Sequence, residues 1–459
     1  MCPAVRFPHV SFVNNRVSSG FVSLGTSSLS IYHLEHLVSD FEFIHFNMIM
    51  NCTKVKLNIA QRWLSTVFRR NLTVLGIETS CDDTGIAIVR RENDNNKVLA
   101  NVMNSQQSFH IRYGGIIPPR AQDLHRSKIA EVYERCLVEA NIKPEEIDAI
   151  AVTTRPGLPL SLMVGLRFAR HIARTYNKPM VPVHHMKAHA LQACMEHTIP
   201  YPFLCLLISG GHSQLCFIKG PEEFLLLGET LDDAPGEAFD KIARRLRLYI
   251  NPEYRNWNGG QIVEQAAKLA SNPEAFEFPL PLARMRDCNF SFAGIKNNSF
   301  RAIKRQERIE ACPPDSVITN YADFCAGLLN AISRHLMNRT QRAMEFCIER
   351  GLFSGNCRSL VVSGGVANND TIFNDISHLA EQYDCKTYRP SKKYCSDNGV
   401  MIAWNAIEQI MNDKQCLTYD YYKIDVQGKA TLGTSLLQEV VEADIKCKWI
   451  KPLRNVENS

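Results

Sequence analysis

The sequence lacks any long apolar run and any strong excess of charge. None of its 459 residues belongs to a stretch near the eighteen or so apolar residues that a membrane-spanning helix needs, so we expect no membrane association. The formal net charge of +5 permits an anionic partner such as RNA without requiring one. With 45% apolar and 22% charged residues, the chain has the composition of a globular protein with room for two or three domains.

The sequence also lacks the cysteine spacing of a redox or zinc motif. It contains 16 cysteines but no C-x-x-C pair. Several of them, including Cys205, Cys216 and Cys325, lie inside apolar runs. This placement favours small buried thiols in a reducing compartment over the disulfide framework of a secreted protein.

Acidic residues are missing from position 43 to position 77. Over the same stretch, residues 54–70 carry five Lys or Arg residues, and a helix there would place Ile59, Trp63 and Val67 on one apolar face. A basic, acid-free, amphipathic segment is typical of a mitochondrial transit peptide. We therefore expect residues 1–71 to be a leader; a disordered basic extension is the alternative.

The rest of the chain repeats one order of secondary-structure elements. Thr73–Ile77 and Gly85–Val89 read as a β-hairpin, and so do Phe203–Ile208 and Gln214–Ile218. Each hairpin is followed later in the chain by a buried strand, a loop of small residues and a helix. The repetition predicts two α/β lobes of related topology with a ligand held between them, and helical periodicity predicts a mainly helical insertion over 228–345.

These patterns divide the chain after the leader into three parts. We expect a first α/β lobe over 72–190 and a second α/β lobe with helical insertions over 191–415. Residues 416–459 form a carboxyl-terminal segment that returns in part to the first lobe. The last helix of the second lobe is expected to start near Ser396 or Asp397, with the aspartate as a suitable N-cap.

Three glycine-rich turns indicate a nucleotide site. They read SGGHS at 209–213, NGGQ at 258–261 and SGGVANN at 363–369. Glycines let the backbone approach a phosphate closely, and the amides at a following helix start can bind the anion. The turns match neither the P-loop pattern nor the dinucleotide fingerprint, which disfavours those two classes.

His185 and His189 stand four positions apart in a predicted helix, so both imidazoles would lie on one face and could hold a metal. A structural role is the ordinary explanation of such a pair. The metalloprotease pattern also needs a glutamate after the first histidine, where this chain has Met186. Spacing does not choose the third ligand; the candidates are Asp82, Asp83, Asp232, Asp240 and Asp397.

Seven ordered motifs, taken together, carry a family resemblance. They are GIETSCDDTGIA, HHMKAH, LISGGHS, DDAPGEAFDK, FSFAGIK, SGGVANN and CSDNGVMIA. In this order they resemble the tRNA N6-adenosine threonylcarbamoyltransferases, and the basic leader is similar to the mitochondrial branch. The resemblance covers about residues 73 to 435 and implies the two-lobed, ribonuclease-H-like fold of actin, Hsp70 and sugar kinases.

The resemblance also implies site residues. One divalent metal ion per subunit, zinc or iron, would be held by His185, His189 and Asp397. Asp82 would face the same cleft and is our candidate for the general base. The family usually reads H-H-M-E-G-H, whereas this chain has Lys187 and Ala188 at the two variable positions. The residues implied to hold the adenylate or its threonylcarbamoyl group are Leu207, Ile208, Ser209, Gly210, Gly211, Asp240, Gly260, Glu264, Asn368, Asn369 and Ser396.

The activity implied is transfer of the threonylcarbamoyl group of threonylcarbamoyl-AMP to N6 of adenosine 37, beside the anticodon, in mitochondrial tRNAs that read codons beginning with A. The expected partners are tRNA and threonylcarbamoyl-AMP, the expected assembly is a homodimer, and the expected location is the mitochondrial matrix. A kinase or ATPase of the actin-like class would share the lobes but would need no histidine pair. A metalloprotease is disfavoured because Met186 cannot act as a base.

Overall fold

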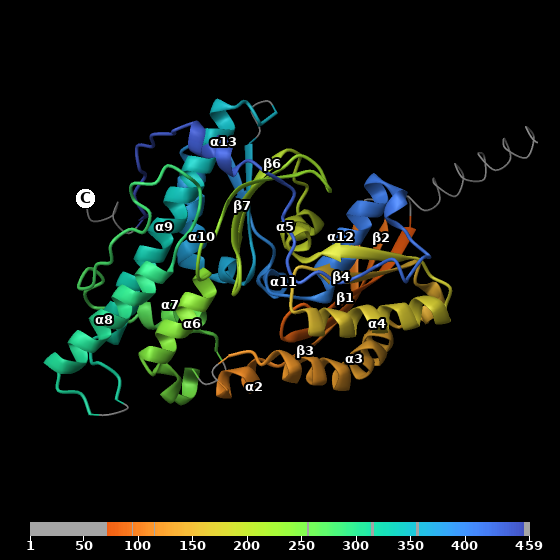
Figure 1. Ribbon diagram of the computed structural model, residues 1–459, viewed down its shortest axis with the longest axis horizontal. Coiled ribbons are helices and arrows are strands. Elements are labelled where there is room, and N and C mark those ends of the chain that lie inside the picture. Colours follow the sequence, from red (N-terminus) through yellow and green to blue (C-terminus); the bar gives the residue numbers. More distant parts are fainter. Residues whose placement is uncertain are drawn as a thin grey trace, which may run out of the picture. The chain divides into compact units, whose positions relative to one another are not determined.

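The computed structural model describes residues 71–453, apart from 94, 114, 255–256, 314–315 and 355–357. All but the last residue of the expected leader therefore lies outside the described residues. The described part contains two β-sheets (Figure 1). The strands are β1 (Asn71–Glu78), β2 (Asp83–Glu92), β3 (Asn95–Ser105), β4 (Ala149–Arg155), β5 (Met180–His184), β6 (Phe203–Ile208), β7 (Ser213–Ile218), β8 (Phe224–Glu229), β9 (Arg358–Ser363), β10 (Cys385–Tyr388) and β11 (Thr434–Ser435).

Helices follow or separate these strands throughout the described residues. The α-helices are α2 (Gln107–Arg112), α3 (Pro118–Ala140), α4 (Pro159–Thr175), α5 (His185–Glu196), α6 (Pro235–Arg245), α7 (Gly259–Ala267), α8 (Ala293–Ile309), α9 (Tyr321–Glu349), α10 (Asp370–Glu381), α11 (Lys392–Cys395), α12 (Gly399–Asn412) and α13 (Leu437–Glu442). Short 3₁₀ turns lie at Pro144–Glu146, Leu248–Ile250, Pro252–Tyr254, Gly365–Asn368 and Lys414–Cys416.

The two sheets repeat one topology. The first has the order β3-β2-β1-β4-β5, and the second, read from its other edge, has β8-β7-β6-β9-β10. In each, three antiparallel strands are followed by two parallel ones. The second sheet gains β11, which runs parallel to β8. Both predicted hairpins are confirmed, and so is the α/β class with duplicated lobes of the actin type.

The central strand β1 is buried along seven of its eight residues. Burial of both faces explains its nearly unbroken apolar sequence, since a strand with helices on both sides has no polar side to show. Ile77 packs with α4 residues such as Leu166 in one core, whereas Val74 packs with α12 residues such as Ala403 in another. The second core also reaches β6 and β9, so α5 and α12 lie between the two sheets (Figure 1).

Glycines allow α12 to sit directly on the first sheet. A Cβ at Gly76 on β1 would lie 2.2 Å from the carbonyl oxygen of Gly399, the first residue of α12. A Cβ at Gly399 would lie 2.4 Å from the backbone nitrogen of Ala87 on β2. This close approach holds the segment that precedes α12 next to the end of β1. The helix falls within residues 191–415 in sequence, yet it packs on the sheet of the first lobe.

The second lobe carries the large helical insertion. Helices α6, α7, α8 and α9 occupy most of the stretch after β8, which confirms the helical prediction for 228–345. The 29-residue α9 is buried along much of its length, and Phe324, Leu328 and Leu336 are completely buried in the core of this lobe. Within the described residues, no helix is both long and apolar enough to cross a membrane.

The carboxyl-terminal segment touches both lobes in turn. Thr418 bridges to Met180 on β5, and the amide of Gln427 donates to the carbonyl of Thr154 on β4. Tyr421 and Ile424 pack in the core of the first lobe. After these contacts the chain crosses to the second lobe, where β11 pairs with β8.

Candidate metal and nucleotide site

Helix α5 places the two histidines. It begins at His185, directly after β5 ends at His184, so its first turn lies at the end of a buried strand. His185 and His189 share one face of the helix, with ring centroids 4.7 Å apart and ring planes nearly perpendicular. Both residues are buried. The one-turn spacing in the sequence therefore does bring the two imidazoles together.

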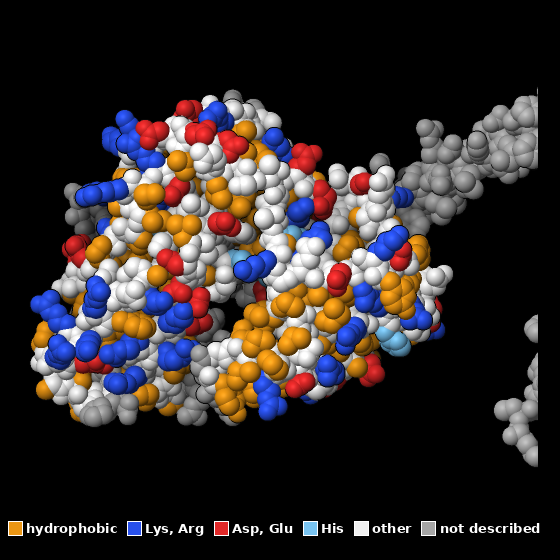
Figure 2. Space-filling view, viewed as in Figure 1, with side chains coloured by type: hydrophobic (Ala, Val, Ile, Leu, Met, Phe, Trp, Pro, Cys, Tyr) orange, Lys and Arg blue, Asp and Glu red, His pale blue; other side chains and the backbone are white. Residues whose placement is uncertain are grey.

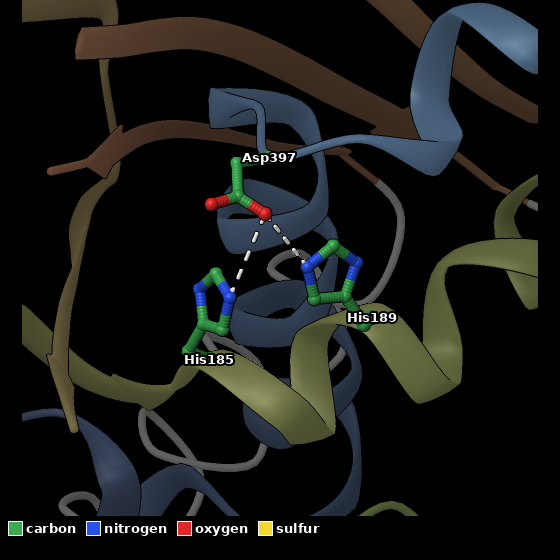
Figure 3. Close-up of side chains that lie close together, drawn as sticks. All are labelled: His185, His189 and Asp397. Atoms are coloured by element: carbon green, nitrogen blue, oxygen red, sulfur yellow. Dashed lines mark hydrogen bonds and ion pairs between the residues drawn. The ribbon is translucent and has the colours of Figure 1, made fainter. Parts of the chain in front are cut away.

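Asp397 meets both histidines from the segment between α11 and α12 (Figure 3). Its Oδ1 lies 3.0 Å from Nε2 of His189 and 3.6 Å from Nε2 of His185. The ligand atoms of the three residues all lie within 4.8 Å of one another, and among the described residues this is the one such group of His, Cys, Asp or Glu. Four other aspartates were open as a third ligand from spacing alone, and none of them joins this group.

The expected N-cap of α12 is corrected by the structure. The helix begins at Gly399, and the side chain of Asn398 accepts a hydrogen bond from the backbone N–H of Met401. The predicted helix start near Ser396 or Asp397 is therefore two or three residues too early, and the predicted N-cap, Asp397, is one residue too early. The physical reason is that Asn398 satisfies the helix terminus. The carboxylate of Asp397 is thereby left to face α5.

The geometry of the three side chains fits a small divalent cation. Nitrogen and oxygen ligands lie about 2.1 Å from zinc, so two ligands at a tetrahedral angle lie about 3.4 Å apart. The two distances from Asp397 Oδ1, 3.0 and 3.6 Å, fall on either side of that value. Two imidazoles and one carboxylate leave an open position for a substrate atom. These donors suit zinc and iron equally.

Glu78 lies behind His185 and was not singled out in the sequence. It is the buried last residue of β1, and its Oε2 lies 3.2 Å from Nδ1 of His185. The hydroxyl of Thr153 donates to the same oxygen at 2.5 Å, and the amide of Ser80 donates to Oε1 at 2.5 Å. A carboxylate on the far nitrogen fixes the ring and its tautomer, which leaves Nε2 to face Asp397. The sequence signal that could have identified Glu78 is an acidic residue at the end of an apolar strand.

The charges of this cluster depend on one another. Burial alone would raise the pKa of Asp397, but His185 and His189 hold it well below its usual range. Burial disfavours protonated His185, yet Asp397 and Glu78 outweigh it and raise the pKa of His185 to about 9. The carboxylates of Glu78 and Asp397 thus both face His185. A metal would take the place of the proton there.

Lys187 does not face the three side chains. Its ammonium lies 2.6 Å from the carboxylate of Glu222 and 5.1 Å from the ring centre of Phe224. Two positions along a helix correspond to about 200°, which turns the lysine to the opposite side of α5. The departure from the usual family motif at this position therefore leaves the cluster of His185, His189 and Asp397 without a neighbouring ammonium.

The turn after β6 is exposed at Gly210 and Gly211. Leu207 and Ile208 are buried strand residues, so only their backbones are available. A Cβ at Gly210 or Gly211 would meet nothing within 4 Å, which leaves open space beside that part of the turn. Ser209 closes the turn, since its hydroxyl accepts from the amide of His212 at 3.0 Å.

His212 belongs to the same turn and is a further residue that the sequence did not assign. Burial lowers its pKa to about 4, and the neighbouring charges of His185 and His189 act in the same direction. The imidazole is thus neutral at physiological pH. The charges of His185, His189 and Asp397 act on the pKa of His212, so the SGGHS turn lies within electrostatic range of these three residues.

Two of the implied acidic residues support loops in the second lobe. Asp240 on α6 accepts a hydrogen bond from the amide of Gly259 at 2.5 Å and so holds the NGGQ turn, which contains Gly260. Glu264 on α7 accepts from the amide of Asp370 at 2.8 Å, at the start of α10. Both carboxylates position glycine-rich or asparagine-rich turns.

The SGGVANN turn presents unsatisfied polar atoms. Asn369 caps α10 through its side-chain oxygen, which accepts from the amide of Ile372 at 3.0 Å. Its Nδ2 and the Oδ1 of Asn368 are buried without a hydrogen-bond partner. The hydroxyl of Ser396 lies 3.7 Å from where a Cβ of Gly365 would stand, so it adjoins the same turn. Buried polar atoms without partners are suited to a polar ligand.

Asp82 completes the arrangement from the turn between β1 and β2. Burial raises its pKa, and the charge of Asp397 raises it further. Asp82 in turn raises the pKa of Asp240, after the larger effects of burial, Gly259 and Arg244. The carboxylate therefore lies within electrostatic range of both the histidine cluster and the second lobe.

Comparisons with known proteins show which family this chain resembles. The profile of the tRNA N6-adenosine threonylcarbamoyltransferase (TsaD) family matches residues 97–404. A Drosophila melanogaster protein named "Probable tRNA N6-adenosine threonylcarbamoyltransferase, mitochondrial" is 64% identical over 86% of this chain and 98% of its own length. The human mitochondrial enzyme of the same name is 40% identical over 82% of this chain and 90% of its own.

One likeness to a solved structure is distant. HypF of T. kodakarensis covers 77% of this chain and 49% of its own at 15% identity, with a TM-score of 0.47, too low for any inference. The family assignment rests on the profile and on the two mitochondrial relatives, which this chain matches over nearly their whole length. The chain belongs to the tRNA N6-adenosine threonylcarbamoyltransferase family.

Proposed function

We propose that this protein transfers the threonylcarbamoyl group of threonylcarbamoyl-AMP to N6 of adenosine 37 in mitochondrial tRNAs that read codons beginning with A. The product is N6-threonylcarbamoyladenosine. One observation carries the proposal: His185, His189 and Asp397 converge beside the SGGHS turn in a chain of this family. The cluster supplies metal ligands, and the turn supplies backbone groups for a nucleotide.

The cluster of His185, His189 and Asp397 and the glycine-rich turns have separate roles in this proposal. His185, His189 and Asp397 would hold one divalent cation, zinc or iron, which would supply Lewis-acid chemistry at the carbamoyl carbonyl. The backbone from Leu207 to Gly211 accommodates the adenylate phosphate, because the open space beside Gly210 and Gly211 admits close approach. The remaining contacts to the adenylate or the threonylcarbamoyl group come from Asp240, Gly260, Glu264, Asn368, Asn369 and Ser396.

Asp82 takes the proton of the attacking amine in this proposal. The exocyclic amine of adenosine is a weak nucleophile because its lone pair is delocalised into the ring, so proton removal has to accompany attack. A carboxylate with a raised pKa is a stronger base than a solvated one. Burial and the charge of Asp397 give Asp82 that property. The adenosine must leave its stack to reach the cleft, which an anticodon loop permits at small cost.

We further propose mitochondrial location and a homodimer that needs no helper protein. The location is supported by the names of the relatives and by the basic, acid-free segment before Asn71. A two-fold dimer would present the same surface twice to RNA. Sedimentation equilibrium of the purified protein tests this assembly, and a monomer that is inactive until another protein is added would contradict it.

The activity is tested with purified full-length protein, threonylcarbamoyl-AMP and an unmodified tRNA transcript, followed by mass spectrometry of the nucleosides. We expect threonylcarbamoyladenosine from the wild type and none from Asp397→Asn. A tRNA transcript with guanosine at position 37 is the matched substrate control. ATP hydrolysis without nucleoside modification would instead favour a kinase or ATPase.

A further inference from the structure

A second cavity lies on the first lobe and shares no residue with the site above. It has a volume of about 560 Å³ and is formed by the carboxyl-terminal half of α4 and the carboxyl-terminal segment that packs on it. We call it the α4 groove. The residues that line it are Arg167, Arg170, His171, Arg174, Thr175, Tyr421 and Tyr422.

The sequence of α4 places its arginines on one side. Arg167, Arg170 and Arg174 follow one another at spacings of three and four, so they form one stripe along the helix. The opposite side carries buried residues such as Ala169 and Ile172, which face the core. The helix is thus cationic outside and apolar inside.

Tertiary contacts fix one wall of the groove. Arg170 donates through Nε to the carbonyl of Tyr421 at 2.9 Å and through Nη2 to the carbonyl of Ile424. Arg174 donates to the hydroxyl of Tyr422 at 2.9 Å. Both guanidinium groups lie about 6 Å from the ring centre of Tyr422, which is itself 72% exposed. The aromatic ring is therefore held in place with much of its surface facing solvent.

The groove keeps uncompensated positive charge. Within the part of the chain that the structure describes, Arg167 is exposed and its side chain has no hydrogen bond or ion pair, and no acidic residue lines the groove. The nearby carboxylate of Asp420 pairs with Lys423 at 2.9 Å. In Figure 2, blue side chains lie over the right-hand end of the region where Figure 1 places α4, and orange side chains cover its left-hand part. Such a surface attracts phosphate groups.

Helix α4 leads from the candidate site to the groove. At its start, the amide of Leu158 donates to the carbonyl of Ser80 at 2.8 Å, and the hydroxyl of Ser80 lies 3.1 Å from Nδ1 of His185. At 1.5 Å per residue, Arg167 and Arg174 lie roughly 12 and 22 Å along the helix from that end. An RNA with one adenosine in the cleft has phosphates within this range.

We propose that the α4 groove binds backbone phosphates of the anticodon arm of the tRNA substrate. This inference rests on the proposed function and identifies the surface that receives the RNA. Arg167 and the outer edge of Arg174 bind phosphate oxygens, since a guanidinium pairs with them in a bidentate manner. The exposed face of Tyr422 packs against an unpaired nucleotide of the loop, as aromatic rings do in single-stranded RNA sites.

The test compares Arg167→Glu with Arg135→Glu in the full-length protein. Arg135 is an exposed residue of α3 in the same lobe, so its variant carries the same change in charge. Dissociation constants for unmodified tRNA are measured by filter binding from 50 to 200 mM KCl. We expect at least tenfold weaker binding for Arg167→Glu at 100 mM, and a salt slope reduced by about one. Arg135→Glu should bind as the wild type does.

Further measurements separate the alternatives. Arg167→Lys should restore most of the binding, and the KM for threonylcarbamoyl-AMP should not change in any variant. A larger change in that KM than in tRNA affinity would mean that the groove takes a small nucleotide, and loss of the dimer on sedimentation would mean that it takes a protein. Either result, or tRNA binding by Arg167→Glu equal to the wild type, overturns the inference. Because binding is measured without turnover, a wild type that binds tRNA but does not modify it would contradict only the proposed function.

Discussion

Nε2 of His189 lies 3.0 Å from Oδ1 of Asp397, although 208 positions separate the two residues in the chain. His189 stands on α5, directly after the last strand of the first sheet, and Asp397 precedes α12, which returns to that sheet after β6–β10 of the second lobe. Gly76 and Gly399 bring α12 against β1, which sets the position of Asp397. The cluster is therefore complete only when both lobes have folded.

Removing either histidine should remove the metal and the activity. His185→Ala and His189→Ala each leave two protein ligands, too few for tight binding of a divalent cation. We expect metal content below about a tenth of the wild type and loss of most transferase activity, with an unchanged circular dichroism spectrum. Lys187→Gln is the matched control on the same helix, because Lys187 pairs with Glu222 on its other side. Full metal content in the double histidine variant would contradict the assignment.

Glu78→Gln should weaken metal binding without removing a ligand. The amide keeps the size of the carboxylate but not its charge, so it holds the Nδ1–H of His185 less firmly. Loss of such an outer carboxylate typically costs about 10- to 100-fold in metal affinity. Chelator titration followed by elemental analysis measures this effect. Equal metal affinity in Glu78→Gln and wild type would show that the carboxylate serves only to accept hydrogen bonds from the Thr153 hydroxyl and the Ser80 amide.

Asp83→Asn should change how stability depends on pH. Burial, followed by the charge of Asp82, raises the pKa of Asp83 to about 7 from 3.8. The folded state then binds more protons than the unfolded chain between about pH 4 and pH 7, so stability falls as the pH rises through this window. Each tenfold difference in proton affinity corresponds to about 1.4 kcal/mol. We expect the Asn variant to melt higher at pH 8 and about equally at pH 4.

Thermal melting from pH 4 to pH 8 tests this, with the exposed Asp123→Asn as the control. A wild type and Asp83→Asn with parallel melting curves over the whole range would rule out the proposed titration.

Gly399→Ala should destabilise the fold. Its Cβ would stand 2.4 Å from the nitrogen of Ala87, and backbone cannot move aside as a flexible side chain can. We expect a loss of about 1 to 3 kcal/mol in the free energy of unfolding, together with lower metal affinity because Asp397 is displaced. Gly294→Ala on α8 is the matched control, since its Cβ would meet nothing within 4 Å. It should be neutral or slightly stabilising. Denaturant unfolding of both variants gives the comparison.

Residues 48–72 should direct a fluorescent reporter to mitochondria, because this segment is basic, amphipathic and free of acidic residues. Microscopy of cells that express the fusion measures the effect. A second fusion in which Arg62, Arg69 and Arg70 are replaced by glutamate should stay in the cytosol. A cytosolic signal from the unaltered segment would contradict the leader assignment.

Local patterns were enough for the elements and their approximate order. Alternating and continuous apolar runs located the two hairpins, because the pattern of apolar residues along a strand depends on which of its faces are buried. The same rule found the helical insertion and the shared face of His185 and His189. The sequence did not determine the N-cap of α12. Asn398 and Asp397 are both suitable N-cap residues, and which of them caps the helix depends on where the helix meets the sheet.

Contacts between distant residues were decided by the tertiary structure alone. Spacing could not choose Asp397 over four other aspartates, because distance along the chain carries no information on distance in space once a lobe intervenes. The tertiary structure alone also determined that Glu78 contacts His185 and that Lys187 points toward Glu222. The α4 groove shows it most directly: the arginine stripe can be read from the sequence, but the wall that makes it a groove comes from Tyr421 and Tyr422, roughly 250 residues later. The sequence by itself determined which segments are apolar and which chemical groups are present. Only the packing of the two lobes, in which burial of apolar surface holds helices such as α4 and α12 against the first sheet, decided which of those groups meet.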